Sequence, residues 1–231
     1  MRRLVYLIAI AIYVPLACPA ETSQYSRTCV GLDIAATAPS EQLLDLICET
    51  VSDQIALLNA CGIVQKRPVT IEAVPVIENV PPNCVGVYHC ATDEIQVVLP
   101  ETLAFRDPPD FLYRGLSTDV AFSSILRHEL THALLEHMTE DRPIHPAAHE
   151  YIAFALQIEA MSDDERAIFL ETNGRRPAKS LDTFNMFIYG LVPGRFASAA
   201  WLHFNSPGHG CDFIQDILEG GVVLGGTHLL P

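Results

Sequence analysis

The chain has 231 residues, of which 49% are hydrophobic and 18% charged, and this is typical of one globular domain with a core of useful size. Its formal net charge of −14 repels phosphate groups and anionic lipid. The charge therefore argues against nucleic acid or a membrane surface as a partner. No long run of acidic residues concentrates it, so a solvated acidic surface is the expected source.

Residues 1–20 differ from the rest of the chain. A basic head at residues 1–3 precedes an apolar run at residues 4–16, which is too short to cross a bilayer comfortably, and small residues follow at Cys18 and Ala20. This pattern predicts a signal peptide cleaved after Ala20, and hence an exported protein, periplasmic or secreted, with no membrane contact after cleavage. A retained anchor and a lipoprotein signal through Cys18 are the alternatives.

Six cysteines follow the predicted signal peptide, and an even number in an exported chain suggests up to three disulfides. They are Cys29, Cys48, Cys61, Cys84, Cys90 and Cys211. The sequence does not select among the possible pairings. Cys84 and Cys90 are not paired by default, because an extended segment between them would hold them about 20 Å apart.

The first half of the chain predicts one helix and several strands. Ser40 can cap a helix that stops near Gly62, which makes residues 21–62 a helical N-terminal segment. Three strand-like stretches follow at residues 68–77, 84–90 and 94–100. The last two flank a turn, so we expect them to lie side by side.

The second half is predicted to be mainly helical. One helix begins near Asp119 and another at Pro146, and Ser162 with Glu165 forms a capping box for a third. Residues 197–204 and 211–220 are the clearest later helices. With no repeats and no low-complexity linker, residues 21–231 are expected to form a single α+β domain.

The sequence H-E-L-T-H at residues 128–132 lies within the helix expected after Asp119. Successive helical residues turn by about 100°, so His128 and His132 share one face and can offer two imidazole nitrogens to one ion. Glu129 is turned away and can reach a water on that ion instead of binding the ion itself. Zinc suits this arrangement, because it accepts imidazole and carboxylate ligands and can keep one position open for water.

The helix around this motif is apolar on two sides. Ile125 and Leu135 share the face of the histidines, and Leu126 and Leu130 lie opposite. A buried imidazole without a partner costs about 1–3 kcal/mol, so two on one face need either a metal or several hydrogen-bond partners. A core helix with hydrogen-bonded histidines is the structural alternative.

A catalytic zinc site needs a third protein ligand, and Glu150 on the next helix can supply it. Here the sequence resembles the gluzincins, zinc metallopeptidases with H-E-x-x-H on one helix and a glutamate ligand on the next. The resemblance covers about residues 120–159. It implies that His128, His132 and Glu150 bind one catalytic Zn²⁺ ion and that Glu129 is the catalytic base.

Other side chains compete with Glu150 for the third ligand position, and His149 is the strongest of them. Glu159 lies more than two turns further along the helix, and no metzincin continuation leads to His137. Asp163 and Asp164 stand at the start of the next helix, where acidic residues favour the helix dipole.

The resemblance also implies a zincin-like fold, in which a small antiparallel or mixed sheet packs on the active-site helix and the C-terminal part is mainly helical. In gluzincins a strand borders the cleft and pairs with extended substrate. Residues 94–99 could be this strand or an interior strand of the sheet. A downstream His or Tyr stabilises the oxyanion in this family. Tyr189, His203 and His209 are the candidates, and no motif selects one.

The expected function is that of an exported zinc-dependent peptidase. It would hydrolyse a peptide or protein substrate with a zinc-activated water and Glu129 as general base. The alternatives are an exported non-catalytic binding or scaffold protein with a zincin-like fold, and an acidic, disulfide-stapled interaction domain without metal. The intact Glu129 favours the peptidase, because a non-catalytic site has no need of this carboxylate.

Overall fold

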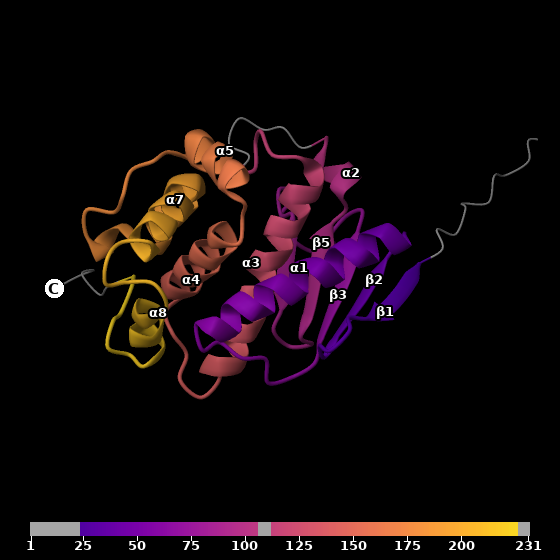
Figure 1. The fold of residues 1–231 in the computed structure, drawn as a ribbon, viewed down its shortest axis with the longest axis horizontal. Helices are drawn as coiled ribbons and strands as arrows, with labels where there is room; N and C mark the ends of the chain where they lie inside the picture. The colour runs from indigo at the N-terminus through magenta and orange to yellow at the C-terminus, as the bar shows by residue number, and fades with distance from the viewer. Residues whose placement is uncertain (1–23, 106–111, 226–231) are drawn as a thin grey trace, which may run out of the picture.

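The structure is a computed structural model that describes residues 24–105 and 112–225. Figure 1 shows its helices and strands. The helices are α1 (Glu41–Ala60), α2 (Pro100–Leu103), α3 (Thr118–Thr139), α4 (Pro146–Glu159), α5 (Asp163–Asn173), α6 (Met186–Leu191), α7 (Pro193–Phe204) and α8 (Cys211–Leu218), with a 3-10 turn at Leu181–Thr183. The strands are β1 (Tyr25–Thr28), β2 (Ile34–Ala38), β3 (Val69–Val74), β4 (Gly86–His89) and β5 (Glu94–Val98). The predicted signal peptide at residues 1–20 lies outside the described residues.

The strands form one mixed sheet in the order β1-β2-β3-β5-β4. The pairs β2·β3 and β3·β5 are parallel, whereas β1·β2 and β4·β5 are antiparallel. Helix α1 is the crossover between the parallel strands β2 and β3, a connection that parallel pairing requires. The expectation of an α+β protein with a small mixed sheet and a mainly helical C-terminal part is therefore confirmed.

Figure 1 shows the sheet on one side of the molecule and α4, α5, α7 and α8 on the other, with α3 between them. Helix α3 contacts both β4 and β5 as well as α1 and α4. Buried polar pairs also join α1 to α3, with Thr50 donating to Ser123 over 3.0 Å and Gln54 donating to Thr131 over 3.0 Å. These contacts fix the position of α3, the helix that carries the H-E-L-T-H motif.

Two strands precede α1 that the sequence did not predict, so the N-terminal segment is not wholly helical. In β2 the inward residues are Ile34, Ala36 and Ala38, all fully buried. Alanine has a weak preference for strands, and β1 is mostly exposed, so neither stretch shows the expected alternation of large apolar residues. Helix α1 itself begins as predicted, with the Ser40 hydroxyl accepting a hydrogen bond from the backbone N–H of Leu43.

Two disulfides, rather than the maximum of three, join the cysteines. Cys29 pairs with Cys48, and Cys61 pairs with Cys211, which links the end of α1 to the start of α8. Cys84 and Cys90 take part in neither bond, as the length of the strand between them indicates. The disulfides fit an exported protein. Within residues 24–105 and 112–225, none of the helices has the length and apolar character needed to cross a membrane.

Candidate metal centre

Helix α3 presents the side chains of the H-E-L-T-H motif from a buried position. Ser117 caps the helix by accepting a hydrogen bond from the backbone of Val120. The apolar residues Leu126, Leu130 and Leu134 are fully buried, and His128 is only 8% exposed. The two-sided burial expected from the sequence is therefore present, and His128 and His132 need partners.

Helix α4 supplies one partner, because the chain turns back after α3 and places Glu150 beside the two histidines. The Glu150 Oε2 atom lies 3.5 Å from His128 Nε2, and its Oε1 atom lies 3.7 Å from His132 Nε2. The two Nε2 atoms are 3.0 Å apart. One ligand atom from each of the three residues lies within 4.8 Å of the others, so the predicted set of His128, His132 and Glu150 forms a group that could hold a metal ion.

The spacing of these atoms fits a small tetrahedral ion. Zinc–nitrogen distances of about 2.0–2.1 Å place neighbouring ligand atoms about 3.3–3.4 Å apart at tetrahedral angles. The separation of the two nitrogens is 3.0 Å, and each nitrogen lies 3.5 or 3.7 Å from the nearer of the two Glu150 oxygens, which is close to this value. Glu150 Oε2 is also buried and has no hydrogen-bond partner at normal distance among the described residues, and a bound cation would satisfy it.

The protonation states of His132 and Glu150 suit metal binding, whereas the pKa of His128 is raised because Glu150 outweighs the opposing effect of burial, so a metal would have to displace a proton from this ring. Burial, together with the charge of His128, lowers the pKa of His132 to about 3, which leaves this imidazole neutral. Burial alone would raise the pKa of Glu150, but the neighbouring His128 holds it below its ordinary value. Neutral imidazole and ionised carboxylate are the forms that bind a metal.

Gln157, also on α4, orients the His128 ring. Its side-chain amide donates to the hydroxyl of Tyr113 over 2.9 Å and to that of Ser124 over 2.7 Å, which turns its Oε1 atom toward His128. In the neutral form of His128, the 2.9 Å contact makes Nδ1 the donor and leaves a lone pair on Nε2, the atom that faces Glu150. Such a partner fixes the tautomer and orientation of a ligand histidine.

Glu129 lies beside this group and not within it. Its side chain packs against Gly86 of β4, where an added Cβ atom would lie 3.0 Å from Glu129 Oε1 and 2.4 Å from Ile125 Cγ2. Burial raises the pKa of Glu129 to about 7, while the charge of His128 and a hydrogen bond from the backbone of Tyr88 act in the opposite direction. A carboxylate with a pKa near neutrality is suited to accept a proton.

Strand β4 borders this site, whereas β5 lies inside the sheet between β3 and β4. The interior alternative for residues 94–99 is therefore the observed one. The backbone N–H of Val98 donates to the backbone carbonyl of Val85. In an antiparallel pair every second residue forms such bonds, so the N–H and C=O groups of Val85, Val87 and His89 point toward β5. The peptide groups of Gly86 and Tyr88 consequently point to the free edge of the sheet, where Tyr88 meets Glu129.

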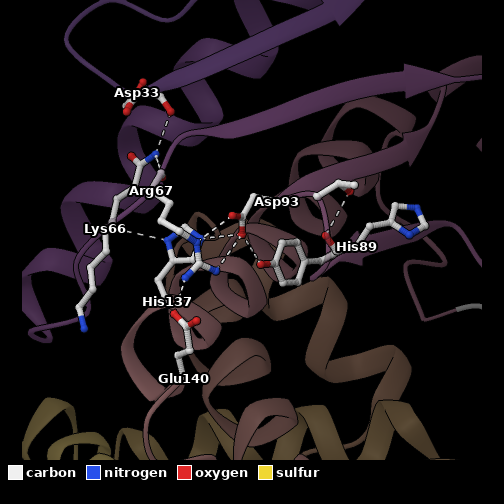
Figure 2. A network of polar contacts seen from close by, with 10 residues as sticks. Asp33, Lys66, Arg67, His89, Asp93, His137 and Glu140 are labelled. Carbon is white, nitrogen blue, oxygen red and sulfur yellow. Dashed lines mark hydrogen bonds and ion pairs between the residues drawn. The ribbon is translucent and has the colours of Figure 1, made fainter.

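A cluster of ionic and hydrogen-bonded side chains holds the β4–β5 turn against α3 (Figure 2). The Asp93 carboxylate accepts hydrogen bonds from Tyr88 over 2.6 Å, from His137 over 2.9 Å, and from Arg67 over 2.8 and 3.1 Å. Arg67 also pairs with Glu140 over 2.7 Å. Tyr88 therefore joins this cluster through its hydroxyl and joins Glu129 through its backbone.

The three oxyanion candidates separate in space. Tyr189 on α6 lines the same cavity as the metal ligands and Glu129, and burial, with the charges of Glu150 and Glu129, raises its pKa. His203 does not line this cavity: its Nδ1 atom lies 2.8 Å from the Tyr151 hydroxyl, and its ring stacks on that of His209. Only Tyr189 of the three reaches the candidate site.

The other residues considered for the third ligand position lie outside the group of His128, His132 and Glu150. His149 lines the cavity, but its ring lies alongside that of His132 with centroids 5.9 Å apart, and it is not part of the ligand group. His137 donates to Asp93 instead. Glu159 accepts hydrogen bonds from Trp201 over 2.8 Å and Asn205 over 3.0 Å. Asp163 and Asp164 stand in the first turn of α5, as expected.

The sequence did not single out Gly86 or Gln157, although each left a signal. A glycine inside a strand pattern indicates a close approach of another group, and here that group is Glu129. Gln157 is the only amide in the apolar stretch of α4 and lies two helical turns beyond Glu150, on the same face. Tyr113 and Ser124 carry no comparable pattern.

The chain belongs to a family of unknown function, DUF6639, whose family model matches residues 34–226. The match includes every residue of the candidate metal centre. No curated protein and no solved structure matches the chain.

Proposed function

We propose that this member of DUF6639 is an exported zinc-dependent peptidase with a zincin-like fold. The observation that carries the proposal is one cavity that holds a three-ligand group and, beside it, a carboxylate that is not a ligand. His128, His132 and Glu150 would hold the ion, and Glu129 would be the general base. A purely structural metal site has no need of a second carboxylate that lines the cavity without joining the ligand group.

When bound, zinc would lower the pKa of a water and polarise a substrate carbonyl. The chain's own residues divide the remaining work. Glu129 accepts the proton from the attacking water and returns it to the leaving amine. The Tyr189 hydroxyl can donate a hydrogen bond to the carbonyl oxygen of the substrate, which becomes an oxyanion when water attacks the carbonyl carbon. Gln157 keeps the His128 ring in place.

The free edge of β4 would bind the substrate backbone. The Tyr88 N–H donates to Glu129, and the Gly86 carbonyl accepts from Cys84 Sγ over 3.0 Å. The Gly86 N–H and the Tyr88 carbonyl are therefore the groups left for a substrate at this edge. An extended peptide could add to the sheet there as a further strand, with main-chain hydrogen bonds that do not depend on its sequence. The scissile peptide bond would then lie over Glu129.

The test is hydrolysis of a broad peptide mixture by zinc-loaded wild-type protein and by Glu129→Gln. The variant keeps the shape of the side chain, so it should bind zinc normally. It cannot accept the proton, so its rate of peptide hydrolysis should be at least about 100-fold lower than that of the wild type. Glu171→Gln, a change at an exposed carboxylate of α5, is the matched control and should remain fully active. Full activity of Glu129→Gln would refute the mechanism. Stoichiometric zinc without any cleavage by the wild type would favour the non-catalytic binding protein.

A further inference from the structure

Two cavities meet at Glu129 and form one groove. The first, of about 290 Å³, contains the metal ligands, and the second, of about 640 Å³, opens beside it. They share Gly86, His128, Glu129 and Tyr189 as lining residues, so a single bound molecule can occupy both. The larger cavity falls within the size range of pockets that bind small ligands or side chains.

The order of the lining residues shows how the groove runs. Along α3 the large cavity is lined by Ile125 and the metal cavity by Glu136, with Glu129 between them. Cys84, just before β4, lines the large cavity, and Cys90, just after β4, lines the metal cavity. Both elements therefore run in the same sense, from the large cavity to the far end of the metal cavity. A helix rises 1.5 Å per residue, so the groove extends about 16 Å along α3, enough for about five extended residues.

One end of the groove is apolar. The residues that line the large cavity include four with aliphatic or aromatic side chains: Leu112, Ile125, Phe154 and Leu191. Phe154 is only 4% exposed, whereas Leu191 is 64% exposed at the rim. A large apolar side chain of a substrate would bury its surface here and gain about 25 cal/mol for each Å² removed from water.

The other end carries a negative charge. The half-buried Glu136 lines the metal cavity and makes no hydrogen bond or ion pair with any residue that the structure describes. Its charge acts on His149 in the same cavity, but burial holds the pKa of His149 below its ordinary value, so this ring does not neutralise Glu136. No Lys or Arg is among the described residues that line either cavity. Glu136 is not part of the group that could hold the metal, so its charge remains available to a cation of the substrate. The net charge of −14 also attracts basic peptides.

We infer that the substrates are extended peptides with a basic residue before the scissile bond and a large apolar residue after it. This inference rests on the proposed function and adds the substrate class. Strand β4 runs from the apolar end to the acidic end, and antiparallel pairing is the more frequent arrangement. A substrate paired in this way enters with its N-terminal side at Glu136 and its C-terminal side in the apolar cavity.

The spacing sets the positions of the two preferred residues. Glu136 lies about 10 Å along α3 from Glu129, which corresponds to about three extended residues. The basic residue is therefore expected two to four positions before the scissile bond. Ile125 lies about 6 Å from Glu129 in the opposite direction, so the apolar residue is expected in the first or second position after the bond.

The first experiment maps cleavage sites by mass spectrometry in a mixture of random synthetic peptides exposed to zinc-loaded wild-type protein. Basic residues should be enriched at the stated positions over acidic ones by roughly fivefold or more, and large apolar residues should be enriched after the bond. Glu136→Lys should reverse the charge preference, whereas Glu171→Lys should leave it unchanged. Leu191→Glu should weaken the apolar preference, whereas Val223→Glu, at a similarly exposed apolar residue elsewhere, should not.

The second experiment separates recognition from catalysis. Zinc-loaded Glu129→Gln is titrated with a blocked, fluorescently labelled decapeptide that carries lysines before a central phenylalanine, and with matched peptides in which glutamates replace the lysines or the order is reversed. Tighter binding of the first peptide, lost in Glu136→Lys, supports the inference even if no cleavage is found. Cleavage without these preferences, or equal binding of the three peptides, would overturn the inference and leave the proposed peptidase activity standing.

Discussion

The substitution Gly86→Ala tests the contact between strand β4 and the H-E-L-T-H helix. The added Cβ atom would lie 2.4 Å from Ile125 Cγ2 and 3.0 Å from the Cγ and Oε1 atoms of Glu129. Carbon atoms pack at about 3.5–4.0 Å, so one of the two elements has to move by about 1 Å or more. Ile125 is only 2% exposed and belongs to a helix packed on several sides, so β4 should move away from Glu129.

The magnitude follows from the packing and from the proposed role of the strand. Overpacking of this kind costs about 1–3 kcal/mol, which lowers the melting temperature of a protein of this size by roughly 2–12 °C. A displacement of about 1 Å at a reacting group can lower the catalytic rate by about 100-fold. Zinc affinity should change little, because the added methyl group does not meet a metal ligand.

The assay measures peptide hydrolysis, zinc content and thermal unfolding of Gly86→Ala, of Ile125→Leu and of the double variant. Leucine has nearly the same volume as isoleucine but lacks the Cγ2 branch, so Ile125→Leu alone should cost less than about 1.5 kcal/mol. In the double variant the shortest contact disappears, and much of the lost stability and activity should return. Wild-type activity and stability in Gly86→Ala would refute the close approach of β4 to Glu129.

Three further predictions concern the partners of the site. Gln157→Leu should weaken zinc binding by about 10–100-fold in a competition titration with a chelator, because it removes the acceptor that orients His128. Hydrogen bonds from Arg67 and Tyr88 hold the pKa of Asp93 well below its usual range, so its stabilising effect is present above pH of about 4 and is lost as the pH falls further. Asp93→Asn should therefore lower the unfolding free energy at pH 7 by about 1–3 kcal/mol and flatten its decline at acid pH, as measured by urea unfolding. Saturating zinc at 100 times its Kd should stabilise the wild type by about 2.7 kcal/mol, and an unchanged melting temperature would count against a specific site.

Local signals were enough to predict the longer helices, whereas the short helices α2 and α6 were not predicted. The Ser40 cap of α1 and the Ser162–Glu165 capping box of α5 are both present, and α3 covers the predicted motif. These features depend on side chains that lie three or four residues apart. Strand β2 was missed because two of its inward positions carry alanines and it pairs with the distant β3, and β1 was missed because it is mostly exposed and pairs only with β2.

The group that could hold a metal ion was predicted from the sequence, whereas the surroundings of the site were not. The His128–His132 spacing is a property of one helix, and Glu150 required only that the next helix turn back. The contact of Gly86 with Glu129 and the contact of Asp93 with His137 join residues more than 40 positions apart. No local periodicity encodes such contacts, and the same limit explains why only Tyr189 of the three oxyanion candidates lies at the site.

Zinc binding by three purified proteins tests the central claim most directly. Competition titration should give one tightly bound zinc ion for the wild type and for Glu129→Gln, and an affinity at least about 100-fold lower for Glu150→Gln, since a ligand matters more than its hydrogen-bond partner. This result would identify Glu150 as the third ligand and Glu129 as a group outside the ligand set. Equal affinity of Glu150→Gln and the wild type, or loss of zinc from Glu129→Gln, would contradict the account.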